Sequence, residues 1–409
     1  GENEGDLVVT SQTGTGKTAS FGFPIIEKTD VSKSNIQHLV LCPTRELCLQ
    51  VADAISTYAK FLKGIKVAAI FGGANIERQI RVIKSGAQIV VATPGRLIDL
   101  MNRKEVNLAK INTLVLDEAD EMLAMGFRDD LEEILADTPK HKKTLMFSAT
   151  MPNEILEIAK KYLNDFEQIG IGKKNSGAEG VSHECYMVHS KDRYMALKRI
   201  VDYCPEIYGI VFCRTRQETQ EVAEKLMEDG YNADALHGDL SQNQRDHVMG
   251  KFRSGHLSLL VATDVAARGI DVDDLTHVIN YNIPDELEVY THRSGRTGRA
   301  GKKGISVVIA NLKEKRKIQI IEKQIKKQFT FKKVPAGREV CEKQLFHMID
   351  RIEKIDVNET EIDSFLPIIY RKLEWLDREE LIKKFVSIEF NRFLEYYKDA
   401  QDINTFDST

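Results

Sequence analysis

The sequence predicts an α/β fold in which two parallel-sheet domains follow one another and a small all-helical region ends the chain. Short β-branched, apolar runs alternate with amphipathic helical windows in two successive stretches, as in parallel sheets covered by helices. The stretch between them, Asn164 to Ser182, carries four glycines and little apolar content, which is typical of a linker. Beyond Lys313 only helical periodicity remains.

These patterns set the expected boundaries. We expect the first domain over residues 1–172, a linker over 173–182, the second domain over 183–312, and a basic helix with further helices over 313–409. The chain opens with Gly1 and a strand is expected almost at once, at Leu7–Val9. We therefore expect a fragment that is clipped at its amino end.

Composition narrows the class of protein. The 409 residues are 42% hydrophobic and 29% charged, an ordinary globular composition that suits two or three domains. The net charge of −4 means that a nucleic-acid role must come from local patches. The six cysteines form no CxxC pair and indicate buried thiols in a reducing cytoplasm. No apolar run reaches the roughly 18 residues of a membrane span.

In the first domain, each expected strand ends in a polar signature. The strands are Leu7–Val9, His38–Leu41, Gln88–Val91, Thr113–Leu116 and Thr144–Phe147. The signatures of the last four begin at Pro43, Thr93, Asp117 and Ser148. Because ligands bind beyond the carboxyl ends of parallel strands, we expect all of these signatures on one rim of the sheet.

Two of these signatures predict phosphate chemistry. The run Ser11-Gln12-Thr13-Gly14-Thr15-Gly16-Lys17-Thr18 fits the phosphate-loop pattern GxxxxGK[ST], with serine in place of the first glycine. Its backbone N–H groups can wrap a phosphate, Lys17 adds a positive charge, and Thr18 can hold magnesium. The carboxylates of Asp117, Glu118 and Asp120 suit a hydrated magnesium ion and an aimed water.

The second domain repeats the strand pattern but has no phosphate loop. Its expected strands are Tyr208–Phe212, Ala233–Leu236, Leu257–Val261, His277–Tyr281 and Ile305–Ala310. Arg293, Arg296 and Arg299 recur at a spacing of three among glycines. They form either a basic turn that faces solvent or guanidinium groups that reach phosphoryl oxygens held by the other domain.

Taken in order, the motifs SQTGTGKT, PTREL, Gly72-Gly73, TPGR, DEAD, SAT, ATDVAARGID and HRSGRTGR are recognisable. The chain resembles the DEAD-box ATP-dependent RNA helicases, whose two domains are RecA-like. Its last hundred residues resemble those of bacterial cold-shock-type members. The family's adenine-reading Q motif lies upstream of the phosphate loop, and the chain starts too late to contain it. The expectation that the nucleotide is ATP rather than GTP therefore rests on the resemblance.

The resemblance implies ATP with Mg²⁺ and a role for each matching residue. The triphosphate would be held by residues 11–18, magnesium by Thr18 and Asp117, and the ribose by Asp271. Glu118 would position or deprotonate the attacking water. Arg296 and Arg299 would approach the γ-phosphate when the domains close. The residues that would couple nucleotide state to closure are Asp120, Ser148, Thr150, His292 and Arg293.

The resemblance also implies that RNA is bound without regard to sequence, mainly through phosphate and sugar contacts. The matching residues of the first domain are Pro43, Thr44, Arg45, Gly73, Thr93, Gly95 and Arg96. Those of the second domain are Arg214, Gly238, Gln242, Arg245 and Thr263.

Three functions remain open on this basis. An RNA-dependent ATPase that separates short duplexes or displaces proteins is the main expectation, since Glu118, Arg296 and Arg299 are all present. An ATP-gated RNA clamp that turns over slowly and recruits partners is the first alternative. A DNA helicase is the second.

The carboxyl-terminal region begins with a strongly basic segment. Lys313–Lys333 has a local net charge of +7, and Ile318, Ile321 and Ile325 stripe one helical face. It is either a solvated helix packed on the second domain or an auxiliary RNA track. The last expected helix, after a cap at Asp377, is apolar on more than one stripe. Either the helices bury one another, or an apolar face is left for a partner. The resemblance to cold-shock-type members implies that this partner is a second copy of the chain, bound through residues 338–409.

Overall fold

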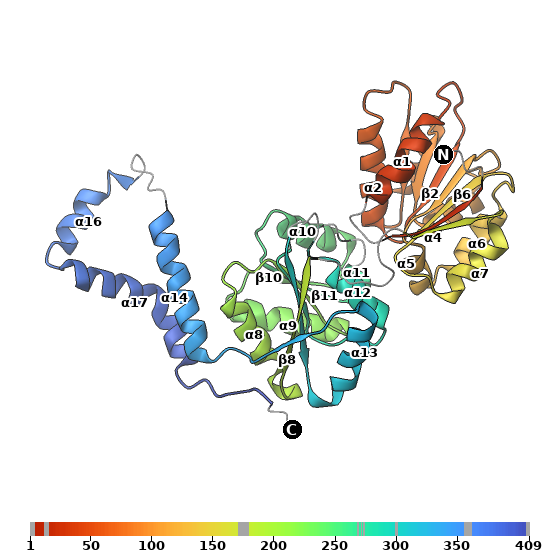
Figure 1. The fold of residues 1–409 in the computed structure, drawn as a ribbon. Coiled ribbons are helices and arrows are strands. Elements are labelled where there is room, and N and C mark those ends of the chain that lie inside the picture. Colours follow the sequence, from red (N-terminus) through yellow and green to blue (C-terminus); the bar gives the residue numbers. More distant parts are fainter. Residues whose placement is uncertain are drawn as a thin grey trace.

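The computed structural model describes residues 5–11, 16–170, 180–267, 270, 272, 275–298, 302–355 and 362–405. It contains two seven-stranded sheets, in which every pair of neighbouring strands is parallel. Figure 1 shows the sheets in two domains beside each other, with a helical arm that projects from the second. The predicted α/β class with a terminal helical region is confirmed.

The first domain is a doubly covered sheet with the strand order β3-β4-β2-β5-β6-β1-β7. Its strands are β1 (Leu7–Thr10), β2 (His38–Leu41), β3 (Val67–Ile70), β4 (Ile89–Ala92), β5 (Thr113–Leu116), β6 (Lys143–Ser148) and β7 (Glu167–Gly170). Its helices are α1 (Lys17–Glu27), α2 (Arg45–Tyr58), α3 (Ile76–Lys84), α4 (Pro94–Asn102), α5 (Ala119–Ala124), α6 (Arg128–Ala136) and α7 (Asn153–Tyr162).

The second domain repeats this topology strand for strand, in the order β10-β11-β9-β12-β13-β8-β14. Its strands are β8 (Val181–Met187), β9 (Gly209–Phe212), β10 (Ala233–Leu236), β11 (Leu259–Ala262), β12 (His277–Asn280), β13 (Gly304–Ala310) and β14 (Thr330–Lys332). Its helices are η1 (Ser190–Asp192), α8 (Arg193–Tyr203), α9 (Arg216–Glu228), α10 (Gln242–Arg253), α11 (Asp264–Ala267), α12 (Leu287–Ser294), η2 (Leu312–Glu314) and α13 (Lys315–Ile325).

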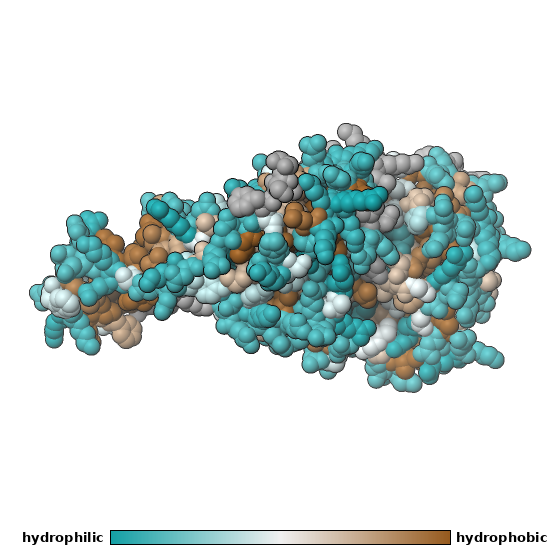
Figure 2. Space-filling view, turned by 90° about the horizontal axis from the view of Figure 1, so that it is seen from below, coloured by the Kyte–Doolittle hydropathy of each residue, from teal (hydrophilic) through white to brown (hydrophobic). Residues whose placement is uncertain are grey.

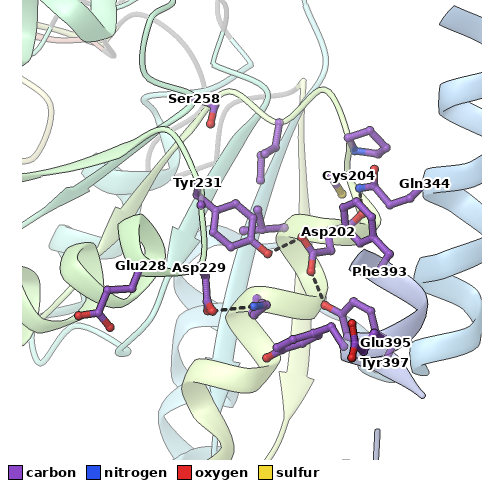
Figure 3. A pocket seen from close by; sticks show the side chains of 16 residues that line it. Asp202, Cys204, Glu228, Asp229, Tyr231, Ser258, Gln344, Phe393, Glu395 and Tyr397 are labelled. Carbon is purple, nitrogen blue, oxygen red and sulfur yellow. Dashed lines mark hydrogen bonds and ion pairs between the residues drawn. The ribbon is translucent and has the colours of Figure 1, made fainter. Parts of the chain in front are cut away.

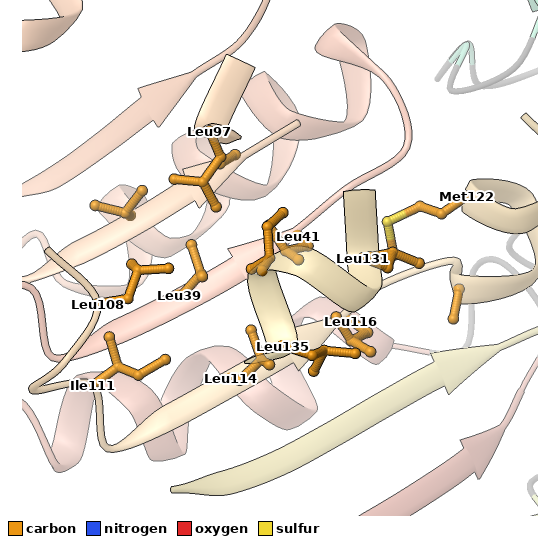
Figure 4. Packing of buried hydrophobic residues seen from close by; sticks show 14 of the residues in the cluster. Leu39, Leu41, Leu97, Leu108, Ile111, Leu114, Leu116, Met122, Leu131 and Leu135 are labelled. Carbon is orange, nitrogen blue, oxygen red and sulfur yellow. The ribbon is translucent and has the colours of Figure 1, made fainter. Parts of the chain in front are cut away.

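Alternation along the central strands creates a core on each face of the sheet. In β2, Leu39 and Leu41 pack into one buried cluster, whereas Val40 packs into the cluster on the other face. Figure 4 shows the first cluster, where Leu97 of α4 and Leu131 of α6 approach the strand residues. Because both faces are covered by helices, the strands consist of continuous apolar runs, as parallel strands usually do.

The structure corrects the sequence prediction at the edges of the sheets. Strands β3, β7, β8 and β14 were not expected, and the predicted linker 173–182 ends inside β8, which pairs with β13. Residues 173–179 of that linker lie outside the described residues. Strands β7 and β14 are exposed along their whole length, so they lack the apolar run that marks a buried strand.

The helical region consists of α14 (Gly337–Lys354), α16 (Leu366–Leu373) and α17 (Arg378–Tyr397). A buried carboxylate anchors it to the second domain: Asp202 of α8 accepts hydrogen bonds from the hydroxyls of Tyr231 and Tyr397 (Figure 3). This network lines a cavity of ≈ 740 Å³ between the two parts. The chain then returns to the second domain, where Asn404 pairs with Val188.

The side-chain cap expected at Asp377 is present, since its carboxylate accepts from the backbone N–H of Glu380 at 2.8 Å.

The alternative of three mutually buried helices is wrong. Among the described residues, the small buried cluster of this region holds only Val340, Cys341, Phe390 and Tyr397. Within the described part of the chain, none of the helices combines the length and apolar character needed to cross a membrane.

Candidate functional site at the domain interface

The predicted signatures lie at the carboxyl-terminal edge of the first sheet. Ser11 follows β1, Pro43 follows β2, Thr93 follows β4, Asp117 follows β5, and Ser148 ends β6. Since these strands are parallel, their ends meet at one rim, as expected. The backbone N–H of Ser11 donates to the carbonyl of Ser148 at 3.0 Å and ties two of the signatures together.

The backbone is strained at the acidic signature. Glu118 has φ 52° and ψ 52°, the left-handed region that a non-glycine residue rarely adopts. Such a conformation costs on the order of 1–3 kcal/mol and persists where surrounding structure enforces it, often at functional sites. It lets β5 turn directly into α5, so that Asp117, Glu118 and Asp120 occupy a single tight corner.

The phosphate-loop lysine reaches this corner. Lys17 opens α1 after Gly16, whose φ of 84° favours glycine, and its Nζ lies 2.7 Å from Oε1 of Glu118. Burial disfavours the charged ammonium, but Glu118 and Asp117 outweigh this effect, so the pKa of Lys17 is raised. The lysine is therefore cationic. Gln12, Thr13, Gly14 and Thr15, also predicted to cradle phosphate, lie outside the described residues.

Asp117 is the most deeply buried carboxylate of the corner, with 3% of its surface exposed. Burial and the neighbouring Glu118 raise its pKa to about 7, although Lys17 acts in the opposite direction. Among the described residues its Oδ1 atom has no hydrogen-bond partner. A buried, unsatisfied carboxylate oxygen is costly unless a cation or a donor compensates it.

Asp120 links the acidic signature to the one that follows β6. Its Oδ2 accepts from the backbone N–H of Thr150 at 2.8 Å and from the Thr150 hydroxyl at 2.7 Å. The hydroxyl of Ser148 donates to the carbonyl of Thr150 at 2.6 Å. The structure thus brings together three of the predicted coupling residues in one network.

His292 extends this network across the domain interface. Its Nδ1 lies 2.5 Å from Oε1 of Glu121, and its Nε2 lies 3.8 Å from Oδ2 of Asp120. Burial lowers the pKa of His292, but Glu121 and then Asp120 outweigh burial, so that it is raised overall. Sequence reasoning missed Glu121. The only sequence feature that could have indicated it was its position directly after the acidic signature, which ends at Asp120.

The arginines that follow occupy different positions. Arg293 is buried within the second domain, where it pairs with Asp264 through two bonds of 2.5 and 2.8 Å and stacks over Phe212. Arg296 donates to the carbonyl of Ile270 at 3.0 Å. It also lines a small cavity together with Glu121 of the first domain, so it faces the interface. Arg299 and Asp271 lie outside the described residues.

Four of the predicted RNA contacts meet where α2 faces α10. Arg45 pairs with Asp246 at 3.1 Å, and Arg245 pairs with Glu46 at 2.8 Å, so each arginine meets a carboxylate of the other domain. A side chain added at Gly73, whose φ is 76°, would approach Gln242 and Arg45. No local pattern indicated Glu46 and Asp246 as these partners, because the two pairs join residues 199 and 201 positions apart in the chain.

The remaining RNA candidates lie at or just beyond the carboxyl ends of strands in the two sheets. Thr44 and Thr93 are the N-cap residues of α2 and α4; Pro43 directly precedes Thr44, and Gly95 lies in the first turn of α4. Arg96 donates to the carbonyl of Ala74 at 3.2 Å, which ties it to the Gly72-Gly73 turn. In the second domain, Arg214 follows β9, Gly238 follows β10 and Thr263 follows β11.

Comparison with known proteins follows the same division of the chain. The family model of the DEAD/DEAH box helicases matches residues 2–158, and that of the helicase conserved C-terminal domain matches residues 193–301. A third model, the helical domain of a probable ATP-dependent RNA helicase, matches residues 340–398.

Similar proteins have been described in bacteria and yeast. ATP-dependent RNA helicase CshA of Listeria monocytogenes is 43% identical over 358 residues, which make up 88% of this chain and 69% of the relative. DEAD-box ATP-dependent RNA helicase CshA of Geobacillus kaustophilus is 43% identical over 360 residues, with 88% and 76% covered. The structure of S. cerevisiae Dbp5 bound to RNA and ADP BeF3 has a TM-score of 0.73 at 28% identity and covers 86% of this chain and 89% of Dbp5. The protein therefore belongs to the DEAD-box ATP-dependent RNA helicases, in their bacterial cold-shock type.

Proposed function

We propose that this protein is an RNA-dependent ATPase that separates short RNA duplexes or remodels RNA–protein complexes by closing its two domains. The carrying observation is the bond between His292 and Glu121, which joins the acidic signature to the second domain at 2.5 Å. A ligand that binds the closed form better than the open form shifts the protein toward closure. ATP and a single RNA strand are two such ligands.

We assign the triphosphate to the corner formed by α1 and the end of β5. Lys17 neutralises phosphate charge, and Glu118, 2.7 Å from it, then orients the attacking water or takes its proton. Arg296, from the second domain, approaches the γ-phosphate on closure, and Arg299 is assigned the same role by its motif. Asp271 is assigned to the ribose in the same way. Hydrolysis therefore requires both domains.

The residues present fit a magnesium ion. The unpartnered Oδ1 of Asp117 provides an oxygen ligand or holds a bound water, and Thr18 lies in the first turn of α1. Magnesium keeps several waters and is held by one or two carboxylates plus substrate phosphates. When bound there with ATP, it would neutralise charge that develops on the phosphate oxygens.

We propose that RNA crosses the meeting point of α2 and α10. Arg45 and Arg245 are paired there with carboxylates of the other domain, and RNA phosphates would compete for the same guanidinium groups. A strand bound to both domains in this way cannot keep duplex geometry once they close.

The ATP-gated clamp is not favoured, because the relatives that match at 43% identity are named ATP-dependent RNA helicases.

We also propose that the helical arm forms a homodimer. Large apolar side chains stand exposed on α16, on α17 and between them, among them Tyr370 at 65%, Trp375 at 70% and Ile388 at 78%. Figure 2 shows apolar residues gathered on the projecting arm. Exposed apolar patches of this kind mark protein interfaces.

A cytoplasmic location is proposed as well, since all six cysteines are free thiols.

The first experiment measures hydrolysis of ATP and of GTP with and without RNA, and with DNA of the same sequence. We expect RNA to stimulate ATP hydrolysis, and DNA to stimulate it weakly because it lacks 2′-hydroxyls. Strand separation is measured alongside, with ATP and with a non-hydrolysable analogue. Multiple-turnover separation with ATP alone supports the helicase. RNA binding without turnover would identify a clamp, and equal stimulation by DNA would identify a DNA enzyme.

A further inference from the structure

Helix α13 has two chemically distinct faces. Ile318, Ile321 and Ile325 are almost completely buried and pack in a cluster with Tyr290 of α12. This face fixes the helix rigidly on the second domain. The predicted stripe of isoleucines is therefore confirmed as the docking face.

The opposite face is basic and exposed. Arg316, Ile320 and Lys323 follow the i, i+4, i+7 spacing that places side chains on one side of a helix. Lys313 precedes this face and Lys326 follows it. We call these five residues the α13 basic face. All five are exposed, and among the described residues its four cations have neither a hydrogen-bonded side-chain partner nor an ion pair.

This face adjoins the proposed RNA path. Asp285 accepts a hydrogen bond from Nζ of Lys317, in the first turn of α13, at 2.8 Å, and lies 3.7 Å from Nη2 of Arg214. Lys317 and then Arg214 lower the pKa of Asp285, so it is ionised and holds both cations together. A strand that contacts Arg214 would thus meet α13 next.

Charge supports a nucleic-acid occupant. The chain as a whole has a net charge of −4, whereas Lys313–Lys333 carries nine basic residues and two acidic ones. Three carboxylates in contact with the segment or within it are paired with cations outside the basic face: Asp285 with Lys317, Glu184 with Lys332, and Glu314 with Arg193. The carboxylate of Glu322 accepts from the backbone N–H of Phe329. The cations of the basic face are thus not balanced by the protein itself.

We propose that the α13 basic face is a second contact for single-stranded RNA, continuous with the path through Arg214. Arg316 and Lys323 bind successive phosphates, and the exposed Ile320 between them packs against a ribose or base. This proposal rests on the proposed function. It adds that a strand long enough to pass Arg214 is bound more tightly than a short one, independently of ATP chemistry.

The test compares the full protein with Arg316→Gln/Lys323→Gln. The matched control is Lys110→Gln/Lys140→Gln, which removes the same charge from exposed residues that precede β5 and β6, at the rim opposite the signatures. For each protein, the affinity for a short oligouridylate and for one three times as long is measured by fluorescence anisotropy over a salt series. RNA-stimulated ATP hydrolysis is recorded with both strands.

We expect the α13 variant to bind the long strand several-fold more weakly and the short strand normally. Its slope of log affinity against log salt for the long strand should fall by about 1.4, since each phosphate contact on a single strand contributes about 0.7. Its maximal ATPase rate should not change.

Normal binding of the long strand by the α13 variant would overturn the proposal while RNA-stimulated hydrolysis by the unmodified protein still upheld the proposed function. A loss equal to that of the Lys110/Lys140 control would overturn it too, because the effect would then be one of net charge alone. Absence of any RNA stimulation in the unmodified protein would instead overturn the proposed function.

Discussion

At the scale of single residues, the site depends on the corner after β5, where the buried Asp117 is followed by Glu118, whose backbone is strained. Burial shields Asp117 from water and raises its pKa to about 7. Glu118 has a left-handed backbone conformation, and its side chain contacts Lys17. Two adjacent carboxylates thus have different environments, which is how neighbouring acids take different roles. Asp117 suits a cation, and Glu118 suits a water.

Glu118→Gln should abolish turnover while nucleotide and RNA remain bound. The amide keeps the shape of the side chain but cannot take a proton, so RNA-stimulated phosphate release should fall by about a hundredfold or more. Fluorescent nucleotide binding and RNA anisotropy measure the retained affinities. Turnover close to the normal rate would remove Glu118 from its assigned role.

His292 should make domain closure depend on pH. Its pKa in the closed form is raised above 6.5, so its charged contact with Glu121 is fully present below that value and is lost as pH rises through the raised pKa. Closure, measured as energy transfer between dyes on the two domains with RNA and a non-hydrolysable ATP analogue, should weaken over this range. His292→Gln should flatten the dependence, and His256→Gln, at an exposed remote site, should not. An unchanged profile in His292→Gln would contradict the assignment.

At the scale of elements, the helical arm is joined to the second domain by few but specific contacts. The hydroxyls of Tyr231 and Tyr397 share the buried Asp202, and the amide of Gln344 bonds the backbone of the same residue. By contrast, α16 and the part of α17 up to Ile388 make no hydrogen bond or ion pair with the second domain among the described residues. The arm is therefore stable at its base and apolar at its tip.

Tyr397→Phe should loosen the base of the arm. It removes one of the two hydroxyls from Asp202, and an unsatisfied buried acceptor costs about 1–3 kcal/mol. Hydrogen exchange of the α17 amides should become faster, with RNA-stimulated ATPase unaffected. Tyr396→Phe is the matched control, because the hydroxyl that it removes bonds Sδ of Met195 and not Asp202. The ring remains in place, with its centroid 3.6 Å from Nζ of Lys198. Equal exchange in both variants would mean that the Asp202 network does not hold the arm.

The tip of the arm should determine the oligomeric state. Phe385→Glu/Ile388→Glu places charge in the exposed apolar face and should convert a dimer into a monomer, as measured by light scattering. Ser387→Glu adds charge at a neighbouring exposed polar position and should leave the dimer intact. A monomeric unmodified protein, or a dimer in both variants, would refute dimerisation through this face.

At the scale of the whole molecule, the proposed catalytic machinery is divided between two domains of identical strand order. The first contributes Lys17 and the acidic corner, and the second contributes His292 and Arg296. Ion pairs of Arg45 and Arg245 add a second set of contacts across the interface. A ligand that joins the two domains at either of these places favours the closed form and thereby helps to bring the other place together.

Arg296→Ala should therefore lose hydrolysis without losing nucleotide. Arginines that stabilise the transferring phosphoryl group contribute about a thousandfold or more to the rate. The ATPase rate at saturating RNA should fall accordingly, whereas nucleotide affinity in the absence of RNA should stay within a few-fold. A comparable loss of nucleotide affinity would show that Arg296 binds the ground state instead.

Buried central strands could be predicted from the sequence, whereas exposed edge strands could not. Val40, between two leucines of β2, belongs to a fully apolar run that only a strand buried on both faces needs. The exposed edge strand Thr330–Lys332 offers no such signal, since its pairing with β8 depends on where the preceding helix ends. Asp120, Thr150 and His292 were predicted from their motifs, whereas Glu121, Glu46 and Asp246 were not.

The sequence alone determined that the motifs follow parallel strands and which chemistry lies on the shared rim, because parallel strands bring their carboxyl ends to one edge whatever lies between them. Only the tertiary structure decided which carboxylate of one domain meets which cation of the other, and that the terminal helices leave an apolar face exposed. The ion pairs of Arg45 and Arg245 join residues 201 and 199 positions apart, so they depend on how rigid domains pack and not on any local pattern.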